Sequence, residues 1–328
     1  MRRSPIVLLS IFLMVVPFIL TEESNAAESY PVKPITFIVP IEAGSDGDIL
    51  TRPLCQKASS VLGQPIVVVN KPGAGSTIGY LELHGAKPDG YTIGMATITI
   101  VTNKLQGLSS HDYRNYTLMG TYYLVPNNVF GSTKTKRPFK TIEEAISFAK
   151  ANPGEVSLST GGIGQSIWIG AMAFITGTGI KVNVIPQSGA GALVIAQVAG
   201  GHTDLGVLSL PAARPQMEAG NVRFLGVLGT KRAPTPYDHV PTLKELGYNA
   251  VWESFGIVMG PPKMPREITE KLIQAFAAAA NDPDYQKYIS ERFTAPFYLP
   301  PERIAPFCDE QRAVVRNIMD KAGILKEK

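Results

Sequence analysis

Two turns built from small residues give this sequence its clearest chemical signal. Residues 40–48 follow an apolar run at 35–39, and residues 70–77 follow a second run at 66–69. A small-residue turn between a strand and a helix leaves the first helical N–H groups without intrahelical partners, and the helix dipole favours negative charge there. The two turns therefore predict one shared anion site, made by the main-chain amides of Ala43, Gly44, Ser45, Gly73, Ala74, Gly75 and Ser76.

Polar side chains at the ends of other expected strands extend this site. Thr97 and Thr99 follow the run at 91–96, and in open α/β sheets ligands bind at the carboxyl ends of strands. In the second half of the chain, Gly-rich turns place further candidates at such ends, namely Ser159, Thr160, Gly164, Gln165, Ser166, Gln187 and Ser188. Trp168 follows closely, and either stacks on a ligand or packs its helix on the sheet. The side chains of this second set donate hydrogen bonds but add no positive charge, which favours a monocarboxylate or modest dicarboxylate over a trianion.

The elements that must position these residues alternate between strand and helix. Strands are expected at 35–39, 66–69, 91–96, 156–159, 181–185, 204–208, 223–227 and 255–259. Helices are expected at 48–61, 141–150, 167–176, 241–246, 266–281, 284–292 and 301–321, and another follows the 70–77 turn and ends at 86. Strand, helix, strand is the pattern of parallel βαβ units, so the fold class is α/β with mostly parallel sheets. The repeat of this pattern indicates two lobes, with the chain crossing between them near 125–128 and again near 251–255.

Composition limits the classes of protein that fit. The chain has 328 residues, of which 45% are hydrophobic and 18% charged, which is a globular composition with room for about two domains. Arg2 and Arg3 precede an apolar stretch at 6–20 and small residues near 26, so residues 1–26 are expected to be a signal peptide, with an uncleaved anchor as the alternative. No cysteine near this point could take a lipid, and no later stretch is apolar for long enough to span a bilayer. The mature chain is thus expected to be exported and not embedded in the membrane.

Charge, histidine and cysteine patterns argue against other functions. The net charge of +4 comes without a basic stripe, so nucleic-acid binding is not expected. The four histidines show no metal-ligand spacing, and neither a metal nor a cofactor is expected. Cys55 and Cys308 could form a disulfide in an oxidising compartment or remain as two buried thiols.

Ordered motifs along nearly the whole mature chain carry a family resemblance. They are Lys33-Pro34-Ile35, Val39-Pro40, Ala43-Gly44, Asp48 to Arg52, Gly63-Gln64-Pro65, Pro72-Gly73-Ala74-Gly75, Pro88-Asp89-Gly90-Tyr91-Thr92, Pro186, Gly200-Gly201-His202, Asp204, Glu218-Ala219-Gly220, Val240-Pro241-Thr242-Leu243 and Gly247. In these the sequence resembles the tripartite tricarboxylate transporter receptors, the TctC-like or Bug solute-binding proteins. Each motif is weak alone, but their number and order make the resemblance specific.

The resemblance implies a two-lobed periplasmic-binding-protein fold of type II-like form. The repeated βαβ units and the two expected crossings predict residues 27–126 and 252–328 in one lobe and 127–251 in the other. It implies a periplasmic, monomeric receptor, without enzymatic activity, that binds a small carboxylate in the cleft and delivers it to large and small permease subunits. Relatives hold the carboxylate with the loops matching 40–48 and 73–77, which adds Ile41, Asp48 and Thr77 to the expected ligand-binding residues. Asp204, one of the motif residues of the resemblance, is expected among them as well. The sequence departs from the family at Ile41, Glu42, Ser45, Trp168 and Gln187-Ser188, so the ligand of a relative does not transfer.

Three rival functions remain as alternatives. Gly73, Gly75 and Gly79 resemble a dinucleotide fingerprint, but the next strand ends in Met95-Ala96-Thr97 without a ribose-reading acid or base. The run Gly164-Gln165-Ser166 approaches a hydrolase nucleophile elbow but lacks its final glycine. A ligand-sensing receptor for a membrane kinase would use the same closed cleft, and the sequence does not separate it from a transport receptor.

Overall fold

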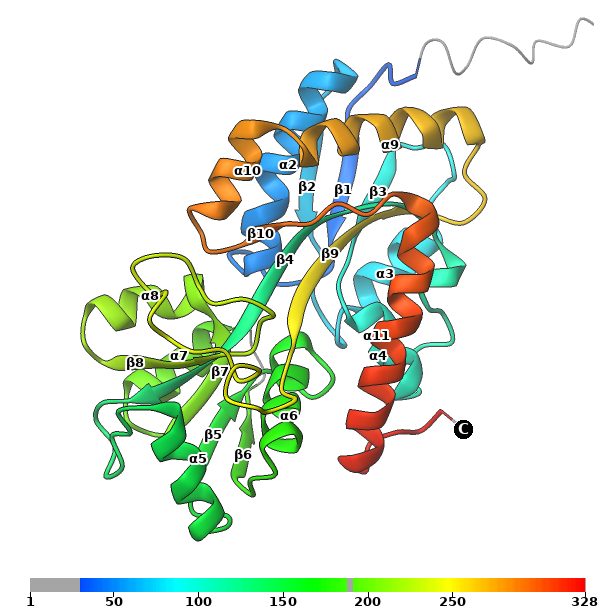
Figure 1. Cartoon of the computed structure of the whole chain (residues 1–328). Coiled ribbons are helices and arrows are strands. Elements are labelled where there is room, and N and C mark those ends of the chain that lie inside the picture. Colours follow the sequence, from blue (N-terminus) through cyan, green and yellow to red (C-terminus); the bar gives the residue numbers. More distant parts are fainter. Residues whose placement is uncertain (1–29, 188–190, 328) are drawn as a thin grey trace, which may run out of the picture. The chain divides into compact units, whose positions relative to one another are not determined.

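Strands and helices alternate along most of the chain in the computed structural model, which describes residues 30–187 and 191–327 (Figure 1). The elements are β1 (Ile35–Val39), α2 (Asp46–Leu62), β2 (Ile66–Asn70), α3 (Thr77–His84), β3 (Thr92–Ala96), α4 (Thr99–Leu105), β4 (Thr117–Ser132), α5 (Ile142–Ala151), β5 (Ser157–Thr160), α6 (Ser166–Thr178), β6 (Asn183–Pro186), α7 (Gly191–Ala199), β7 (Leu205–Ser209), α8 (Leu210–Glu218), β8 (Val222–Val227), β9 (Glu253–Gly260), α9 (Arg266–Ala280), α10 (Pro283–Ser290), β10 (Ala295–Pro296) and α11 (Pro301–Lys321). Pro31–Lys328 form one compact unit. The expected signal peptide lies outside the described residues.

The sheet joins two groups of parallel strands through an antiparallel pair. Its order is β2-β1-β3-β9-β4-β7-β5-β6, and β8 and β10 also pair with β4. In the first strand group β1 is parallel to β2 and β3, and in the second strand group β5 is parallel to β6 and β7. Strands β4 and β9 run antiparallel to each other and to their other neighbours. The α/β class is confirmed, and the parallel strands are those that the βαβ pattern predicts.

Strand β4 changes its partner between Pro126 and Asn127. It pairs with β9 as far as Pro126, which is opposite Glu253, and with β7 from Asn127, which is opposite Ser209. Figure 1 shows β4 and β9 side by side as long arrows that link the two strand groups. This change of partner falls where the sequence predicts the first crossing, while the division into lobes stays a prediction.

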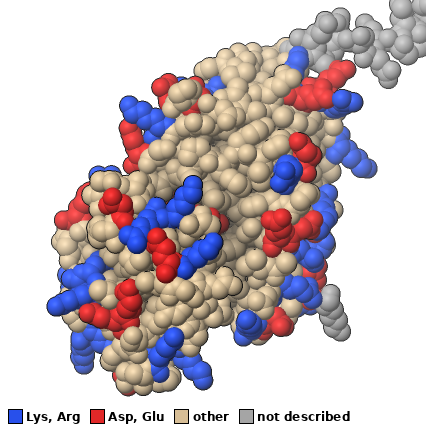
Figure 2. Space-filling model, viewed as in Figure 1, with Lys and Arg blue, Asp and Glu red and all other residues tan. Residues whose placement is uncertain are grey.

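Acidic and basic side chains are interspersed on the face drawn in Figure 2, with wide uncharged areas between them. A protein that tracks a nucleic-acid backbone needs its cations gathered in a groove or stripe. This face offers no such stripe.

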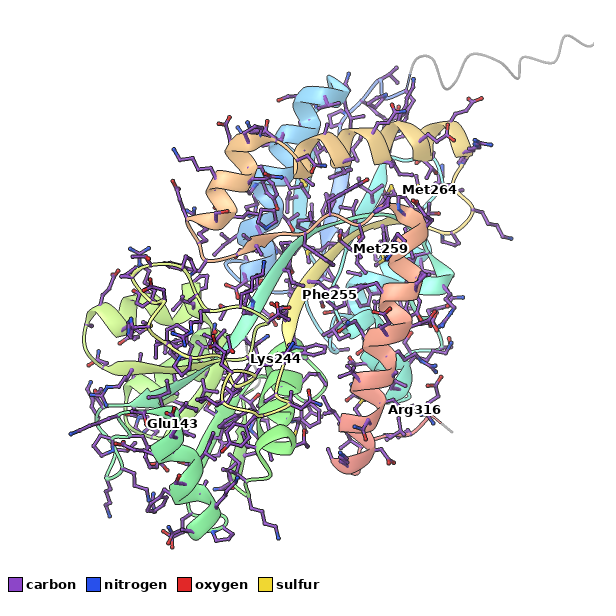
Figure 3. All side chains as sticks on the ribbon, in the orientation of Figure 1. Glu143, Lys244, Phe255, Met259, Met264 and Arg316 are labelled. Carbon is purple, nitrogen blue, oxygen red and sulfur yellow. The ribbon has the colours of Figure 1, made fainter. Side chains whose placement is uncertain are left out.

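Aromatic pairs fix the helices on the sheet. Phe37 of β1 packs against Phe276 of α9, with ring centroids 5.8 Å apart. Phe255 and Met259 lie along β9 (Figure 3), and both are buried. The Phe255 ring meets the edge of Phe307 of α11 at 4.9 Å. The core therefore continues from the helices of the first strand group along β9.

Three expectations about elements need correction or addition. The helix expected at 241–246 is a turn, in which Thr242 and Glu245 exchange the hydrogen bonds of a capping box without a helix following. The sequence did not identify β4, because an apolar run that contains Pro126 reads as a broken segment. Helix α4 was also missed, since its seven residues are too few for a periodic pattern.

The two cysteines are free thiols, and both are buried. Burial raises the pKa of Cys308 to about 12, and it also raises that of Cys55. These thiols are therefore unreactive in the folded chain. Within residues 30–187 and 191–327, no helix is both long and apolar enough to cross a bilayer.

Candidate functional site

The turn between β1 and α2 is shaped by the carboxylate of Asp48. Gly44 N–H donates to Asp48 Oδ2 (2.9 Å), and Arg52 Nη2 and Asn70 Nδ2 donate to Oδ1 (2.8 and 3.0 Å). Asn70 Nδ2 also donates to the carbonyl of Ile41 (3.1 Å). Asp48 and the Gly44 amide were expected to bind the ligand, but their hydrogen bonds are used within the turn. They support the site and do not contact the ligand directly.

Burial alone raises the pKa of Asp48, but hydrogen bonds from Arg52, Gly44 and Asn70 outweigh it and hold the pKa below the usual carboxyl value. The carboxylate is therefore ionised at neutral pH.

The amino end of α2 is left without a side-chain cap. The hydroxyl of Ser45, its N-cap residue, donates to the carbonyl of Glu42 instead (2.7 Å). The first helical bond runs from Ile49 N–H to Ser45 O (2.9 Å), and the side chain of Glu42 is exposed. Uncapped amides at a helix amino end attract anions, as the sequence predicts for this turn.

The turn between β2 and α3 has an unusual backbone. Four consecutive residues have positive φ: Gly73 (+124°), Ala74 (+47°), Gly75 (+61°) and Ser76 (+74°). Two of them carry a Cβ, which costs about 1–2 kcal/mol for each in the left-handed region. Asn103 of α4 holds this conformation by donating from Nδ2 to Gly75 O (2.8 Å) and to Thr77 Oγ1 (2.9 Å). Strain kept in a turn by outside support is typical of ligand-binding loops.

Hydroxyl groups gather beside this turn. Thr97 Oγ1 lies 2.9 Å from Thr99 Oγ1, which lies 2.7 Å from the hydroxyl of Tyr80. Tyr80 also accepts the N–H of Thr97 (3.1 Å). Thr99 is buried within this chain of hydroxyls, and Thr97 is its partly exposed end. Thr97 is therefore the member that is able to reach a ligand.

The second strand group presents buried hydroxyls without partners. Ser159 and Thr160 end β5, Ser209 ends β7, and their hydroxyl oxygens have no hydrogen-bond partner among the described residues. The hydroxyl of Ser76 in the first strand group shares this state. Buried polar groups are nearly always satisfied, so four such hydroxyls at strand and turn ends point to missing polar partners.

Ser166 has protein partners at the junction of the two strand groups. The indole N–H of Trp252 donates to Ser166 Oγ (2.9 Å), which lies 2.5 Å from Ser254 Oγ. Gln165 Oε1 accepts the N–H of Gly162 (3.2 Å), and the N–H of Gln187 donates to Thr160 O (2.8 Å). These contacts bring the expected residues of the β5 and β6 ends together, while Ser188 lies outside the described residues.

Two expected residues lie away from this edge. Asp204 precedes β7 and accepts from the N–H and Oγ of Ser157, both at 2.9 Å, and from Arg137 Nη1 (3.3 Å). Ser157 is the first residue of β5, so Asp204 braces the amino ends of these strands, opposite to the expected site. Trp168 is 4% exposed and belongs to the hydrophobic core, which is the alternative that the sequence left open for it.

Contacts between the two strand groups add residues that the sequence did not single out. Gly164, with φ +79°, lies against the side chain of Gln106, and a Cβ there would collide with the Gln106 amide. Asp46 is the first residue of α2, and the Ser209 hydroxyl acts on its carboxyl group. Burial raises the pKa of Asp46, and the nearby Ser209 hydroxyl only partly offsets this. Asp46 and Gln106 are ordinary polar residues in ordinary spacing, so no sequence signal marked them.

The arrangement suits recognition of an anion by dipoles instead of cations. The cations beside the two turns are already paired, Arg52 with Asp48 and Lys71 with Glu82 (3.3 Å). The described residues contain no group of three or more His, Cys, Asp or Glu side chains that could hold a metal ion. What remains is a set of helix amino ends and hydroxyls, which donate hydrogen bonds to a carboxylate.

Comparisons with known proteins give consistent results. Residues 50–324 match the model of the tripartite tricarboxylate transporter family receptor, TctC. The chain is 32% identical over 306 residues to the UPF0065 protein in the gbd 5' region of Cupriavidus necator, covering 92% of this chain and 90% of that one. It is 32% identical over 278 residues to protein BugT of Bordetella pertussis, covering 79% and 83%.

Among solved structures, Rpa4515 of R. palustris with adipate superposes with a TM-score of 0.82 at 27% identity, covering 90% of this chain and 99% of that one. The family model alone spans more than half of the chain, and the relatives match along most of its length. The chain therefore belongs to the TctC family of tripartite tricarboxylate transporter receptors.

Proposed function

We propose that the protein is a periplasmic solute receptor that binds a small carboxylate-containing ligand between two lobes and delivers it to a tripartite tricarboxylate transporter permease. In this proposal residues 1–26 are the signal peptide that exports the chain, and the mature protein is a monomer. Family membership supports the receptor role, since TctC proteins are the receptors of these transporters.

The observation that carries the ligand class is the set of unpartnered hydroxyls beside uncapped helix ends. Ser76 lies in the first strand group, and Ser159, Thr160 and Ser209 lie in the second. The helices that begin at Asp46 and Ser166 have no side-chain cap. A carboxylate offers four lone-pair sites, so it satisfies several of these donors at once without a counter-cation.

The proposed lobes are residues 27–126 with 252–328, and residues 127–251. A ligand that touches donors from both strand groups favours the arrangement in which they are close, which is the basis of closure in two-lobed receptors. The proposed contacts are the amides of Ala43 and of residues 73–76, the hydroxyls of Thr97 and Thr160, residues 164–166, and Gln187 and Ser188. Asp48 and Thr77 support the turns from behind.

The proposed ligand is a monocarboxylate or a modest dicarboxylate. Neutral hydroxyls in the second strand group cannot compensate three negative charges, which disfavours a citrate-like ligand. Adipate in the related Rpa4515 is a ligand of this size and charge.

A thermal-shift screen of carboxylates tests this function directly. A ligand that binds only the folded state adds about 2.7 kcal/mol of stability at a concentration of 100 Kd. We expect mono- and dicarboxylates to raise the melting temperature in a concentration-dependent way, and the matching primary amides to have no effect. If amides stabilise as well as acids, or no carboxylate stabilises the protein, the proposed ligand class is wrong.

A further inference from the structure

Two histidine rings are stacked at the far end of the helix that follows the second anion-site turn. His84 is the last residue of α3, and His111 lies in the segment after α4. Their ring centroids are 4.0 Å apart, and the ring planes make an angle of 24°. The ring of Tyr116 meets His84 edge-on, with centroids 5.5 Å apart. The stack therefore fastens the end of α3 to the chain that follows α4.

The same two helices build and support the β2–α3 turn of the candidate site. Helix α3 starts at Thr77, and Asn103 of α4 donates to Gly75 O and to Thr77 Oγ1. The hydroxyl of Tyr116 donates to the carbonyl of Tyr80 (2.9 Å). The Tyr80 hydroxyl in turn belongs to the chain of hydroxyls beside the turn. Direct contacts thus connect the histidine stack to the candidate site through α3 and α4.

The carboxylates next to the stack in sequence are already paired with cations. Asp112 pairs with Lys104 (2.8 Å) and Arg114 (3.2 Å). Burial raises the pKa of Asp112, but the bonds from these partners outweigh it and hold the pKa below the usual carboxyl value. Glu82 of α3 pairs with Lys71 (3.3 Å). Within residues 30–187 and 191–327, no carboxylate forms an ion pair with either stacked histidine.

The surroundings of the stacked rings disfavour positive charge. The Nδ1 atom of His111 is buried and has no hydrogen-bond partner among the described residues. A protonated imidazole donates from both nitrogens, so a charged His111 leaves a buried N–H donor unsatisfied. Burial, together with the facing His111, lowers the pKa of His84. Burial raises the pKa of Tyr116 and of Tyr80, so these neighbouring phenols stay neutral and compensate no charge.

We propose that the His84–His111 stack is a pH-sensitive fastener of the candidate site. Neutral rings hold α3 against the segment after α4. Protonation of both rings in a mildly acidic medium places two like charges 4.0 Å apart without a compensating acid, and they repel. The rings then separate, and the β2–α3 turn loosens. The anion-site turn is thus firm at neutral pH and looser in acid, whichever ligand the protein binds.

Replacing His84 by Phe tests the fastener, because a phenyl ring keeps the stack but carries no charge. The folded pKa of His84 lies below the unfolded value of about 6.5, so stability is complete above that pH and is lost as pH falls through the folded pKa. Urea unfolding of the ligand-free protein at pH 7.5 and pH 5.5 measures this. Over this range the unfolding constant of the parent should rise about fivefold more than that of His84→Phe. His239→Phe, at an exposed histidine outside both helices, should behave like the parent.

Hydrogen exchange followed by NMR tests the connection to the turn. The N–H groups of Thr77 and Tyr80 donate to Ala74 O (3.2 Å) and Ser76 O (3.1 Å), so they report on the β2–α3 turn and the first turn of α3. At pH 5.5 these two amides should exchange about fivefold faster in the parent than in His84→Phe, and at pH 7.5 equally fast. Unchanged exchange at these amides, while the stability of the parent falls, overturns the proposed link to the site.

An NMR titration of the histidine rings in the parent needs no variant. One ring of the stack should protonate at a lower pH than the histidines of the urea-unfolded chain. Protonation of both rings as in the unfolded chain, or equal acid destabilisation of the parent and His84→Phe, overturns the inference. None of these measurements uses a ligand, so their result is separate from that of the carboxylate screen.

Discussion

Asp46 and Asp48 lie two positions apart at the start of α2, yet their carboxyl groups have opposite environments. Asp48 receives donors from Gly44, Arg52 and Asn70, which lower its pKa in spite of burial. Asp46 is desolvated without comparable donors, and its pKa is raised. The ionised Asp48 therefore stabilises the fold at neutral pH, whereas the ionised Asp46 destabilises it.

Replacing Asp48 by Asn should destabilise the protein at pH 7. The unfolding free energy of the variant should also fall less steeply than that of the parent as the pH is lowered. The folded pKa lies below the unfolded value of about 3.9, so the contribution of Asp48 is present above about pH 4 and is lost as pH falls through the folded pKa. Urea unfolding between pH 3 and pH 7 measures this. Equal loss of stability at all pH values would show that Asp48 acts through packing and not through its charge.

Replacing Asp46 by Asn should have the opposite effect and stabilise the folded protein at pH 7. Because the folded pKa is raised above the unfolded value, the cost of ionising Asp46 is absent below about pH 4 and grows as pH rises. The ligand-free variant should therefore melt at a higher temperature than the parent at pH 7 and at nearly the same temperature at pH 3. A lower melting temperature at pH 7 would mean that the carboxylate has a stabilising partner.

Asn103 is a buried residue that supports the 73–76 turn, so its removal should weaken both the fold and the candidate site. Asn103→Ala leaves Gly75 O and Thr77 Oγ1 without their donor, which costs about 1–3 kcal/mol of unfolding free energy. Carboxylate affinity should fall as well, because the 73–76 turn loses its support. Asn281→Ala is the control: this exposed residue makes one similar bond to Ala277 O (2.8 Å), and its loss should cost less than about 0.5 kcal/mol. Similar costs for both would argue against a special role for Asn103.

At the scale of elements, the two anion-site turns should respond differently to an added methyl group. Gly44 has φ +78° and open space at its Cβ position, so Gly44→Ala should cost only the left-handed penalty of about 1 kcal/mol. At Gly75, with φ +61°, the Cβ would also approach Asn103 Oδ1 at 3.3 Å. Gly75→Ala should therefore lower both the melting temperature and the carboxylate affinity by more than Gly44→Ala. The reverse order would contradict the supporting role of Asn103.

Alanine is a better probe than valine at both glycines. A β-branched residue at positive φ strains the backbone whatever the ligand does, so Gly44→Val or Gly75→Val would mix lost folding with lost binding.

The elements with strong local signals were predictable from the sequence. Helix α11 begins at Pro301 and ends at Lys321 as expected, since proline and glutamate at the first turn mark its start. The turns at 40–48 and 73–77 were predictable because small residues between a strand and a helix have few other uses. Strand β4 was not, because its pairing with β7, β8 and β9 depends on residues far away in the sequence.

The candidate site shows the same limit. Thr160 and Gln187 were placed together correctly by the rule that parallel strands share an edge. Asp204 was expected among the ligand-binding residues, but it precedes β7 and accepts a hydrogen bond from Ser157 at the start of β5, so it lies at the opposite edge of these strands. Asp46 and Ser209 are more than 160 residues apart in sequence, and no local pattern predicts that the Ser209 hydroxyl acts on the Asp46 carboxyl group.

At the scale of the whole molecule, a ligand that bridges the strand groups should make the protein more compact. We expect small-angle scattering to show a smaller radius of gyration at saturating carboxylate, since the ligand favours the closed arrangement by its differential contacts. Asp48→Asn offers a comparison, because a loosened β1–α2 turn should shift the ligand concentration needed and not the closed radius. An unchanged radius in a protein that demonstrably binds ligand would exclude closure as the response.

The hydrogen bond from Trp252 to Ser166 gives the chain an intrinsic optical reporter. Trp168 and Trp252 are its two tryptophans, and both are buried in the same hydrophobic core. Trp252 immediately precedes β9 and donates its indole N–H to the first residue of α6 (2.9 Å). Indole fluorescence depends on hydrogen bonding and local polarity. A relative movement of β9 and α6 should therefore shift the emission wavelength of Trp252. An unlabelled solution of this protein should therefore signal its own occupancy through Trp252.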